Sequence, residues 1–365
     1  AASVIIANRQ PPPRPAATLR GPAGQAPCSA AFSPGSTTLA VAGCRAGVSV
    51  WDIATRRRVA TLTSPRCVGG EQVIFSPDGR ALAQFGGHAV SPTGRHYHPA
   101  TCLWDMATRR ETTLTDSPLL TATSAQGAFS PDGTTLAVAD NSGKIYLWNL
   151  ATRRVTATVP ASRYCAPLCP IAFSPDGTML AVGQSDPSGD RGHVYLWNLA
   201  ARRWAGTLTD PGRGIGSLAF GRNGILAVGA DDDHAYLWDV AARRLTGTIA
   251  PPINVAAGNA SISKGPKGGG PYPGPGYFDK STTAALSPDG TTLAIDVSFG
   301  YGTYVYHAAT RNRVATLPYP YPAGRYHFAA GLVFSPDGTM LAVDAADPSL
   351  DNGHVYLWDL TRNRD

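Results

Sequence analysis

The residues of this chain best suited to chemistry are its histidines, acidic turns and six cysteines. His96 and His98 flank Tyr97, and alternate residues on an extended segment can both ligate a metal ion, but the sequence shows no third ligand. The acidic segments 186–190 and 347–351 can bind calcium, although aspartates that cap their own turns account for them more simply. We therefore predict no metal site and no cofactor.

Motifs for catalysis are missing from the sequence. The glycine-rich segments 212–216 and 265–268 lack the strand–loop–helix setting of a phosphate-binding loop. The chain has no Gly-x-Ser-x-Gly motif and no cysteine–histidine pairing typical of nucleophilic catalysis. We predict that the protein is not an enzyme.

These residues are set in a phrase that recurs seven times. The clearest copy, 127–159, runs from Gly-Ala-Phe-Ser-Pro-Asp-Gly through Leu-Ala-Val-Ala and Ile-Tyr-Leu-Trp-Asn-Leu to Ala-Thr-Arg-Arg. Ser-Pro-Asp-Gly, or a relic of it, follows Phe32, Phe75, Phe129, Phe173, Phe220, Leu286 and Phe334. Trp-Asp or Trp-Asn occurs at Trp51, Trp104, Trp148, Trp197, Trp238 and Trp358, and Tyr306-His307 takes its place in the sixth copy.

Each copy predicts four short antiparallel strands. Ser-Pro-Asp-Gly is a tight turn between the first two, because Pro fixes φ and Gly permits positive φ. Leu-Ala-Val-Ala is a buried second strand, Ile-Tyr-Leu-Trp an alternating third, and the Thr-rich segment after Ala-Thr-Arg-Arg a half-exposed fourth. Lysine and glutamate are scarce, which argues against exposed helices. Four strands repeated about every 45 residues are typical of a propeller blade.

The repeats resemble the WD-repeat family from about Pro15 to the end, and their phrasing is similar to the WD-repeat sensor domains of actinobacterial membrane serine/threonine kinases. The resemblance implies an all-β, single seven-bladed β-propeller. One departure is clear: the family's Gly-His pair before the first strand is missing, since Gly192-His193 and Gly353-His354 precede third strands instead. We therefore expect the family's buried hydrogen-bond network, which ends at the Trp, to be absent.

Ring closure is also predicted. The last copy stops at 361–365, before its fourth strand, and the missing strand lies at the other end as residues 15–20. We expect 15–20 to join the last blade and remove a sheet edge. The domain is then 15–365, with blades at about 21–64, 65–116, 117–160, 161–210, 211–250, 251–318 and 319–365 plus 15–20. Residues 1–14 are interpreted as a frayed tail or a membrane-proximal linker, with a membrane tether before Ala1 as one possibility.

The cysteines fall within single blades as three pairs. We predict disulfides Cys28–Cys44, Cys67–Cys102 and Cys165–Cys169, which place the domain outside the cytoplasm. The alternative is six unrelated buried thiols.

Strand direction assigns the loops to two faces. The bottom face carries the Ser-Pro-Asp-Gly and Ala-Thr-Arg-Arg turns, and the top face carries the second-to-third-strand and inter-blade loops. An Arg pair recurs in the bottom turns and forms a basic ring that includes Arg57, Arg110, Arg154, Arg203, Arg244 and Arg313. A basic ring can meet phosphate, but turn aspartates share this face, and repeated residues usually serve the repeat. No aromatics interleave with the arginines, so nucleic acid is not expected as a partner.

The top face differs most between copies, and variable loops on a rigid scaffold are where ligands usually bind. We predict a protein or peptide site from the aromatic and histidine residues of three long insertions. These candidates are His96, Tyr97, His98, Tyr272, Tyr277, Phe278, Tyr319, Tyr321 and Tyr326. The alternative is that these tyrosines pack on their own blades.

Together these features predict a monomeric, non-catalytic binding or sensor domain, the extracytoplasmic part of a bacterial membrane signalling protein. Arg9 and Arg14 argue against this orientation, because positive residues beside a membrane helix favour the cytoplasmic side. The alternative is a cytoplasmic interaction scaffold or the sensor end of a signalling ATPase.

Overall fold

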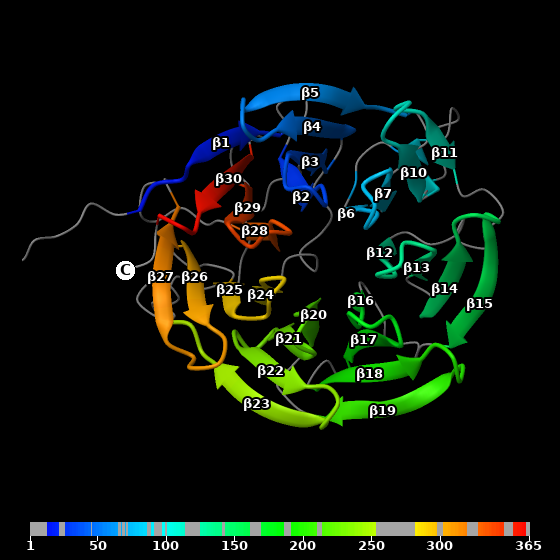
Figure 1. Ribbon diagram of the computed structural model, residues 1–365, viewed down its shortest axis with the longest axis vertical. Helices are drawn as coiled ribbons and strands as arrows, with labels where there is room; N and C mark the ends of the chain where they lie inside the picture. Colours follow the sequence, from blue (N-terminus) through cyan, green and yellow to red (C-terminus); the bar gives the residue numbers. More distant parts are fainter. Residues whose placement is uncertain are drawn as a thin grey trace, which may run out of the picture.

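Seven four-stranded antiparallel sheets form a ring in the computed structural model (Figure 1). The structure describes residues 13–21, 26–44, 46–64, 67, 70, 72–85, 89–90, 97–98, 101–113, 125–140, 143–160, 169–185, 191–209, 214–252, 282–297, 302–319, 328–346 and 353–362. Within these residues every regular element is a strand. No described helix is long and apolar enough to cross a membrane.

The strands fall into seven blades, each numbered by its place in the chain. Blade 1 contains β2 (Pro27–Phe32), β3 (Thr38–Gly43), β4 (Val48–Asp52) and β5 (Arg57–Leu62). Blade 2 contains β6 (Gln72–Phe75), β7 (Ala81–Phe85), β10 (Cys102–Asp105) and β11 (Glu111–Thr113). Blade 3 contains β12 (Ala125–Phe129), β13 (Thr135–Asp140), β14 (Lys144–Asn149) and β15 (Arg154–Pro160). A separate hairpin pairs β8 (Ala89–Val90) with β9 (Tyr97–His98).

Blades 4 to 7 repeat the arrangement. Blade 4 contains β16 (Ile171–Phe173), β17 (Met179–Ser185), β18 (Gly192–Asn198) and β19 (Arg203–Thr209), and blade 5 contains β20 (Ile215–Phe220), β21 (Ile225–Ala230), β22 (Ala235–Asp239) and β23 (Arg244–Ile249). Blade 6 contains β24 (Thr282–Leu286), β25 (Thr292–Val297), β26 (Gly302–His307) and β27 (Arg313–Pro318). Blade 7 contains β28 (Phe328–Phe334), β29 (Met340–Ala346), β30 (His354–Asp359) and β1 (Ala17–Arg20). The first strand of each blade lies toward the centre of the ring (Figure 1).

Closure of the ring occurs in blade 7. Strand β1 pairs antiparallel with β30, from Ala17 opposite Leu357 to Arg20 opposite His354. The prediction that residues 15–20 supply the last blade's outer strand is confirmed, and so is the seven-bladed all-β fold. Because β30 runs toward the bottom face, β1 runs from the bottom face to the top.

The Ser-Pro-Asp-Gly turns are held by their own side chains. In blade 3 the Ser130 hydroxyl accepts from the Thr135 N–H at 2.9 Å and donates to Asp132, whose carboxylate accepts from the Thr134 N–H at 3.0 Å. Gly133 has φ of 68°, which only glycine adopts at little cost. Ser and Asp therefore satisfy the backbone where the chain reverses.

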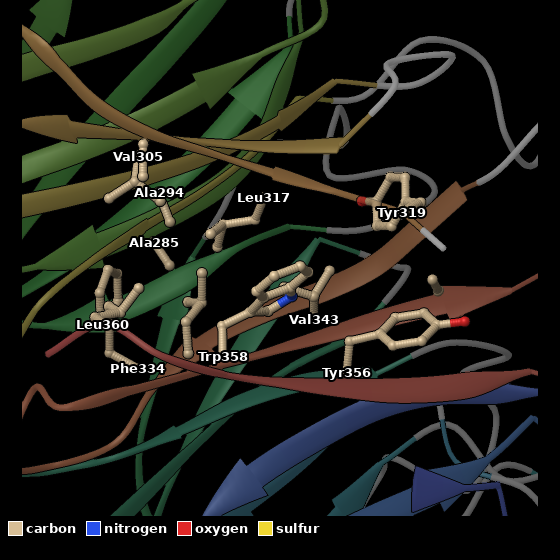
Figure 2. Close-up of a cluster of buried hydrophobic side chains, with 13 residues drawn as sticks. Ala285, Ala294, Val305, Leu317, Tyr319, Phe334, Val343, Tyr356, Trp358 and Leu360 are labelled. Carbon is tan, nitrogen blue, oxygen red and sulfur yellow. The ribbon is translucent and has the colours of Figure 1, made fainter. Parts of the chain in front are cut away.

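The core lies between neighbouring blades. The cluster between blades 6 and 7 packs Val305 and Leu317 of one blade against Val343 and Trp358 of the next (Figure 2). Leu-Ala-Val segments of the second strands are almost wholly buried in every blade that has them, as the repeat predicts. Each blade therefore buries its faces on its neighbours.

Candidate functional site

A cavity of about 660 Å³ lies at the bottom mouth of the central channel. The ends of the first strands and the turns that follow them form its wall. Its side chains are mostly apolar and include Phe173, Phe220, Leu286 and Phe334 of four successive blades. Among the residues that line it, Arg222 alone is charged. This size and an apolar lining with few polar groups are typical of small-molecule sites.

Around most of the ring, neighbouring turns pack closely on the bottom face. The Gly of one Ser-Pro-Asp-Gly turn lies against the Pro of the preceding turn at four junctions. A Cβ on Gly79, Gly133, Gly177 or Gly338 would lie 3.3, 3.6, 3.7 or 4.0 Å from the Cδ of Pro34, Pro77, Pro131 or Pro288, respectively. These contacts join the turns of successive blades at the channel rim.

Blade 5 breaks this pattern. Its turn is Gly221-Arg222-Asn223-Gly224 in place of Ser-Pro-Asp-Gly. The Arg222 N–H donates to the Pro288 carbonyl at 3.0 Å, and the Asn223 Nδ2 donates to the Gly290 carbonyl at 3.3 Å, so the turn leans on blade 6. No described atom lies within 4 Å of a Cβ placed on Gly224.

The consequence is a gap on the other side of this turn. Pro175 of blade 4 has no such contact with Gly224, and it lines the cavity together with Pro131 and Pro288. Arg222 lies at the rim with an exposed side chain. Where five of the other turns carry Asp, this turn carries the neutral Asn223, so Arg222 has no carboxylate in its own turn.

The aspartates of the other turns are engaged locally. The Ser130 hydroxyl holds the pKa of Asp132 below its usual range, and the Ser174 hydroxyl does the same for Asp176. Asp52 and Asp105, in the turns before the fourth strands, have lowered pKa values because each accepts from the N–H and hydroxyl of a Thr three residues later. These carboxylates stay charged and serve their own turns.

The basic ring lies on the same face, exposed, and starts the fourth strands. The first Arg of each pair adopts the left-handed conformation, with φ between 50° and 62°, at Arg56, Arg109, Arg153, Arg202, Arg243 and Arg311. In the described part of the ring the one ion pair joins Arg362 Nε to Asp359 at 3.1 Å. The aspartates of the Ser-Pro-Asp-Gly turns, which share this face, bond mainly to Ser and Thr, and Asp78 also lies 3.9 Å from Arg80 Nε.

Two ring arginines contact the neighbouring blade. The Arg243 guanidinium donates to the Ala205 carbonyl and lies over Gly206, both in β19 of blade 4. Arg311 lies in the same way over Gly247 in β23 of blade 5. These contacts support the interpretation that repeated arginines serve the repeat.

Comparison with known families is informative for one blade. Residues 116–149 match the family model described as WD domain, G-beta repeat. This match, on a chain with seven four-stranded blades, supports a WD-repeat β-propeller. No curated protein matches the chain significantly.

The hydrogen bonding of the repeat tryptophans reflects the missing Gly-His pair. The Nε1 atoms of Trp51, Trp148, Trp238 and Trp358 are buried and have no hydrogen-bond partner among the described residues. In blade 2 the Trp104 Nε1 donates to Gln84 at 3.1 Å. The expected loss of the family's network fits these four blades.

Side-chain hydrogen bonds link the first strands of neighbouring blades. A polar side chain three residues before the end of one first strand accepts from a backbone N–H of the next blade's first strand. The Val73 N–H donates to Ser29 at 3.1 Å, Gly127 to Gln72 at 2.7 Å, and Ala284 to Ser217 at 2.8 Å. The sequence analysis missed these links, because their two partners lie about 45 to 67 positions apart.

Most of the predicted top-face ligand residues lie outside the described residues. These are His96, Tyr272, Tyr277, Phe278, Tyr321 and Tyr326. For Tyr97 and His98 the structure describes the backbone, which forms β9 and pairs with β8. The predicted top-face site therefore stays a prediction.

Tyr319 requires a correction. Sequence analysis counted it among the top-face ligand candidates and kept packing on its own blade as the alternative; only 8% of it is exposed, and it packs in the core between blades 6 and 7 (Figure 2). Its hydroxyl donates to the buried Asp296, which also accepts from the Thr303 hydroxyl at 2.8 Å. Burial raises the pKa of Asp296 to about 7 and that of Tyr319 well above its usual range.

The cysteines are oxidised at two of the predicted pairs. Disulfides join Cys28 to Cys44 and Cys67 to Cys102, with Cα–Cα distances of 5.0 and 6.4 Å. Cys169 is also disulfide-bonded, while Cys165 lies outside the described residues. The five described cysteines lie toward the top face, where the variable loops leave the blades.

One group of possible metal ligands occurs in the described part of the chain. Cys67, Cys102 and Glu111 bring two sulfurs and a carboxylate within 4.8 Å of one another. The disulfide occupies both sulfurs, so only the reduced protein offers this ligand set.

The channel-mouth cavity is the site that sequence analysis missed. Its signal was present: Arg222 and Asn223 depart from a turn that six other copies keep or nearly keep. The altered turn leans on blade 6 and leaves a space beside blade 4. This direction depends on contacts with blade 6 that no sequence pattern encodes.

Proposed function

We propose that this propeller is a non-catalytic protein-binding domain that lies outside the cytoplasm, as the sensor part of a bacterial membrane signalling protein such as a serine/threonine kinase. The WD-repeat architecture supports the general role, since such rings are typically interaction modules. The variable top-face loops are the proposed contact surface for a protein or peptide.

The observation that carries the proposal is the pair of disulfides toward the top face. Cys28–Cys44 ties the start of β2 to the residue after β3, and Cys67–Cys102 ties the segment before β6 to the start of β10. Structural disulfides persist in oxidising compartments and are rare in the cytosol. Their position suggests a purpose, because they fix the strand ends from which the variable loops extend.

The alternative is a cytoplasmic scaffold or the sensor end of a signalling ATPase. The grouping of Cys67, Cys102 and Glu111 is the feature that favours it, because reduced thiols beside a carboxylate are a usable ligand set. The redox state of these cysteines in the cell therefore separates the two functions.

Compartment is tested by trapping thiols in cells that produce the full-length parent protein. Acid quenching and alkylation with one maleimide, followed by reduction and alkylation with an isotopically heavy one, reports each cysteine separately. We expect the heavy label on all six cysteines. Light label on Cys67 and Cys102 would contradict an extracytoplasmic location and favour the scaffold.

Binding is tested by photo-crosslinking in the same cells. A photoreactive phenylalanine replaces Tyr97 in the top-face hairpin, and a matched control replaces Val59, an exposed residue of the outer strand β5. We expect a discrete crosslinked protein from position 97 and none from position 59. Equal crosslinking from both, or none from position 97, would count against a top-face protein site.

A further inference from the structure

We propose that the channel-mouth cavity on the bottom face binds a small apolar carboxylate, with its hydrocarbon part between the phenylalanines and its carboxylate beside Arg222. This site is distinct from the top-face loops and does not depend on the compartment. A propeller with both sites joins a small-molecule input on one face to a protein contact on the other.

The apolar part of the ligand is indicated by the wall. Phe173, Leu286 and Phe334 line the cavity and are otherwise largely buried in the blades. Ala219, Leu332 and Val333 fill the spaces between them. Burial of hydrocarbon against such a wall removes apolar surface from water on both sides, which is the main drive for binding.

The charge of the ligand is indicated by Arg222. It is the one charged residue in the lining, and its exposed guanidinium can donate hydrogen bonds to a carboxylate at the rim. The nearest turns on either side keep Asp176 and Asp289, but these carboxylates accept from Ser174 and Ser287 within their own turns. The rim therefore favours one negative charge.

A comparison of this turn with the same turn in the other blades also supports a ligand site at Arg222. Six blades have Pro at the position of Arg222, namely Pro34, Pro77, Pro131, Pro175, Pro288 and Pro336. Residues common to all copies serve the fold, so the copy that departs is free to serve a ligand. Here the departure both supplies the cation and removes the Pro–Gly contact that closes the rim at four other junctions.

The test is isothermal titration calorimetry of the full chain with decanoate, and with decanol as an uncharged ligand of the same length. Arg222→Gln removes the charge, Ala219→Trp fills the cavity, and Arg244→Gln removes an exposed arginine outside it. We expect decanoate to bind the natural sequence and Arg244→Gln equally, Arg222→Gln about fivefold more weakly, and Ala219→Trp not at all. Thermal unfolding confirms that each variant is folded.

Decanol separates charge from hydrocarbon. It should bind more weakly than decanoate to the natural sequence, and equally to the natural sequence and Arg222→Gln. No binding of decanoate at millimolar concentration overturns the proposal, and so does an equal loss in Arg222→Gln and Arg244→Gln. A hydrophobic peptide with a free carboxyl end is titrated in parallel: if it binds and decanoate does not, the cavity is a peptide site. None of these outcomes alters the cysteine or crosslinking results, so the two proposals fail separately.

Discussion

The buried carboxyl of Asp344 in blade 7 lies beside the backbone N–H of Ala30 in blade 1, which offsets part of the rise that burial causes in the pKa of the carboxyl, while its Oδ1 has no hydrogen-bond partner among the described residues. This contact crosses the junction where the ring closes. At other junctions Ser29, Gln72 or Ser217 of a first strand accepts the equivalent N–H, but blade 7 has Gly331 at that position. A Cβ on Gly331 would lie 3.1 Å from Asp344, so the glycine leaves the space in which the second-strand carboxyl reaches across.

Asp344 makes stability depend on pH. Burial raises its pKa to about 8 from 3.8, so the folded protein holds an extra proton between about pH 4 and pH 8. The free energy of unfolding therefore falls as the pH rises through this window. Asp344→Asn stays neutral, and we expect its thermal midpoint to fall several degrees less than that of the natural sequence between pH 5 and pH 9.

Two comparisons sharpen this pH experiment. Asp296, with a pKa of about 7, retains part of the slope in Asp344→Asn, and the double variant with Asp296→Asn should be nearly flat. The pKa of Asp132 is lowered in the folded protein, so its ionised carboxylate stabilises the fold, and this stabilisation is lost at low pH. Asp132→Asn should therefore lower the free energy of unfolding only near and above pH 4. Parallel curves for the natural sequence and Asp344→Asn would show that Asp344 is ionised when folded.

Tyr319→Phe removes the hydroxyl that donates to Asp296. The carboxyl is fully enclosed and keeps the Thr303 hydroxyl as a donor, so we expect a loss of about 1–3 kcal/mol in urea unfolding. Tyr236→Phe is the matched control, because its hydroxyl donates to the partly exposed Asp232. A smaller loss in Tyr319→Phe than in Tyr236→Phe would mean that Tyr319 lies at the surface after all.

The disulfides should stabilise the ring unequally. Cys28–Cys44 spans 16 positions and Cys67–Cys102 spans 35, and loop-closure entropy gives about 3 and about 4 kcal/mol. We expect the Cys67→Ser/Cys102→Ser double variant to lose more stability in urea than Cys28→Ser/Cys44→Ser, when the remaining cysteines are oxidised. Addition of reductant should then lower the free energy of unfolding of the natural sequence below that of either variant. An unchanged free energy of unfolding in reductant would contradict structural disulfides.

Gly224 and Gly290 separate backbone strain from packing in the turn beside the cavity. Both have positive φ, at 79° and 74°, so alanine at either costs about 1 kcal/mol. A Cβ on Gly224 meets no described atom, whereas one on Gly290 collides with the Asn223 side chain. We expect Gly290→Ala to be the more destabilising and, because it displaces Asn223, to weaken decanoate binding as well, whereas Gly224→Ala should bind decanoate normally. Equal losses of stability would show that the turn does not lean on blade 6.

How far the sequence predicted this molecule depends on the range of each interaction. The strands and turns were predictable because Ser130, Asp132 and Gly133 act within one turn, and the same phrase occurs in each blade. Closure was predictable because the last copy lacks exactly the strand that residues 15–20 supply. The paired cysteines could be read because both partners of each described pair belong to one blade.

Interactions between blades were harder to predict. Tyr319 follows β27 in a run of Pro and Tyr that resembles an exposed loop, while its partner Asp296 lies in β25, where a carboxylate is unusual. The cavity was missed for the same reason, since it depends on contacts of Arg222 and Asn223 with Pro288 and Gly290 of the next blade. The repeated sequence predicts the features that all blades share. The Tyr319–Asp296 contact and the cavity arise from residues that differ between blades.

The pairing of β1 with β30 also sets the order in which the protein can be completed. Blades 1 to 6 each form from one contiguous stretch of chain, so their strands can pair, and neighbouring blades can pack, before synthesis is complete. Blade 7 needs Ala17 beside Leu357, which nearly the whole length of the chain separates. During synthesis β1 is therefore an open strand edge that waits for its partner, and the last step of folding is the slow, long-range one.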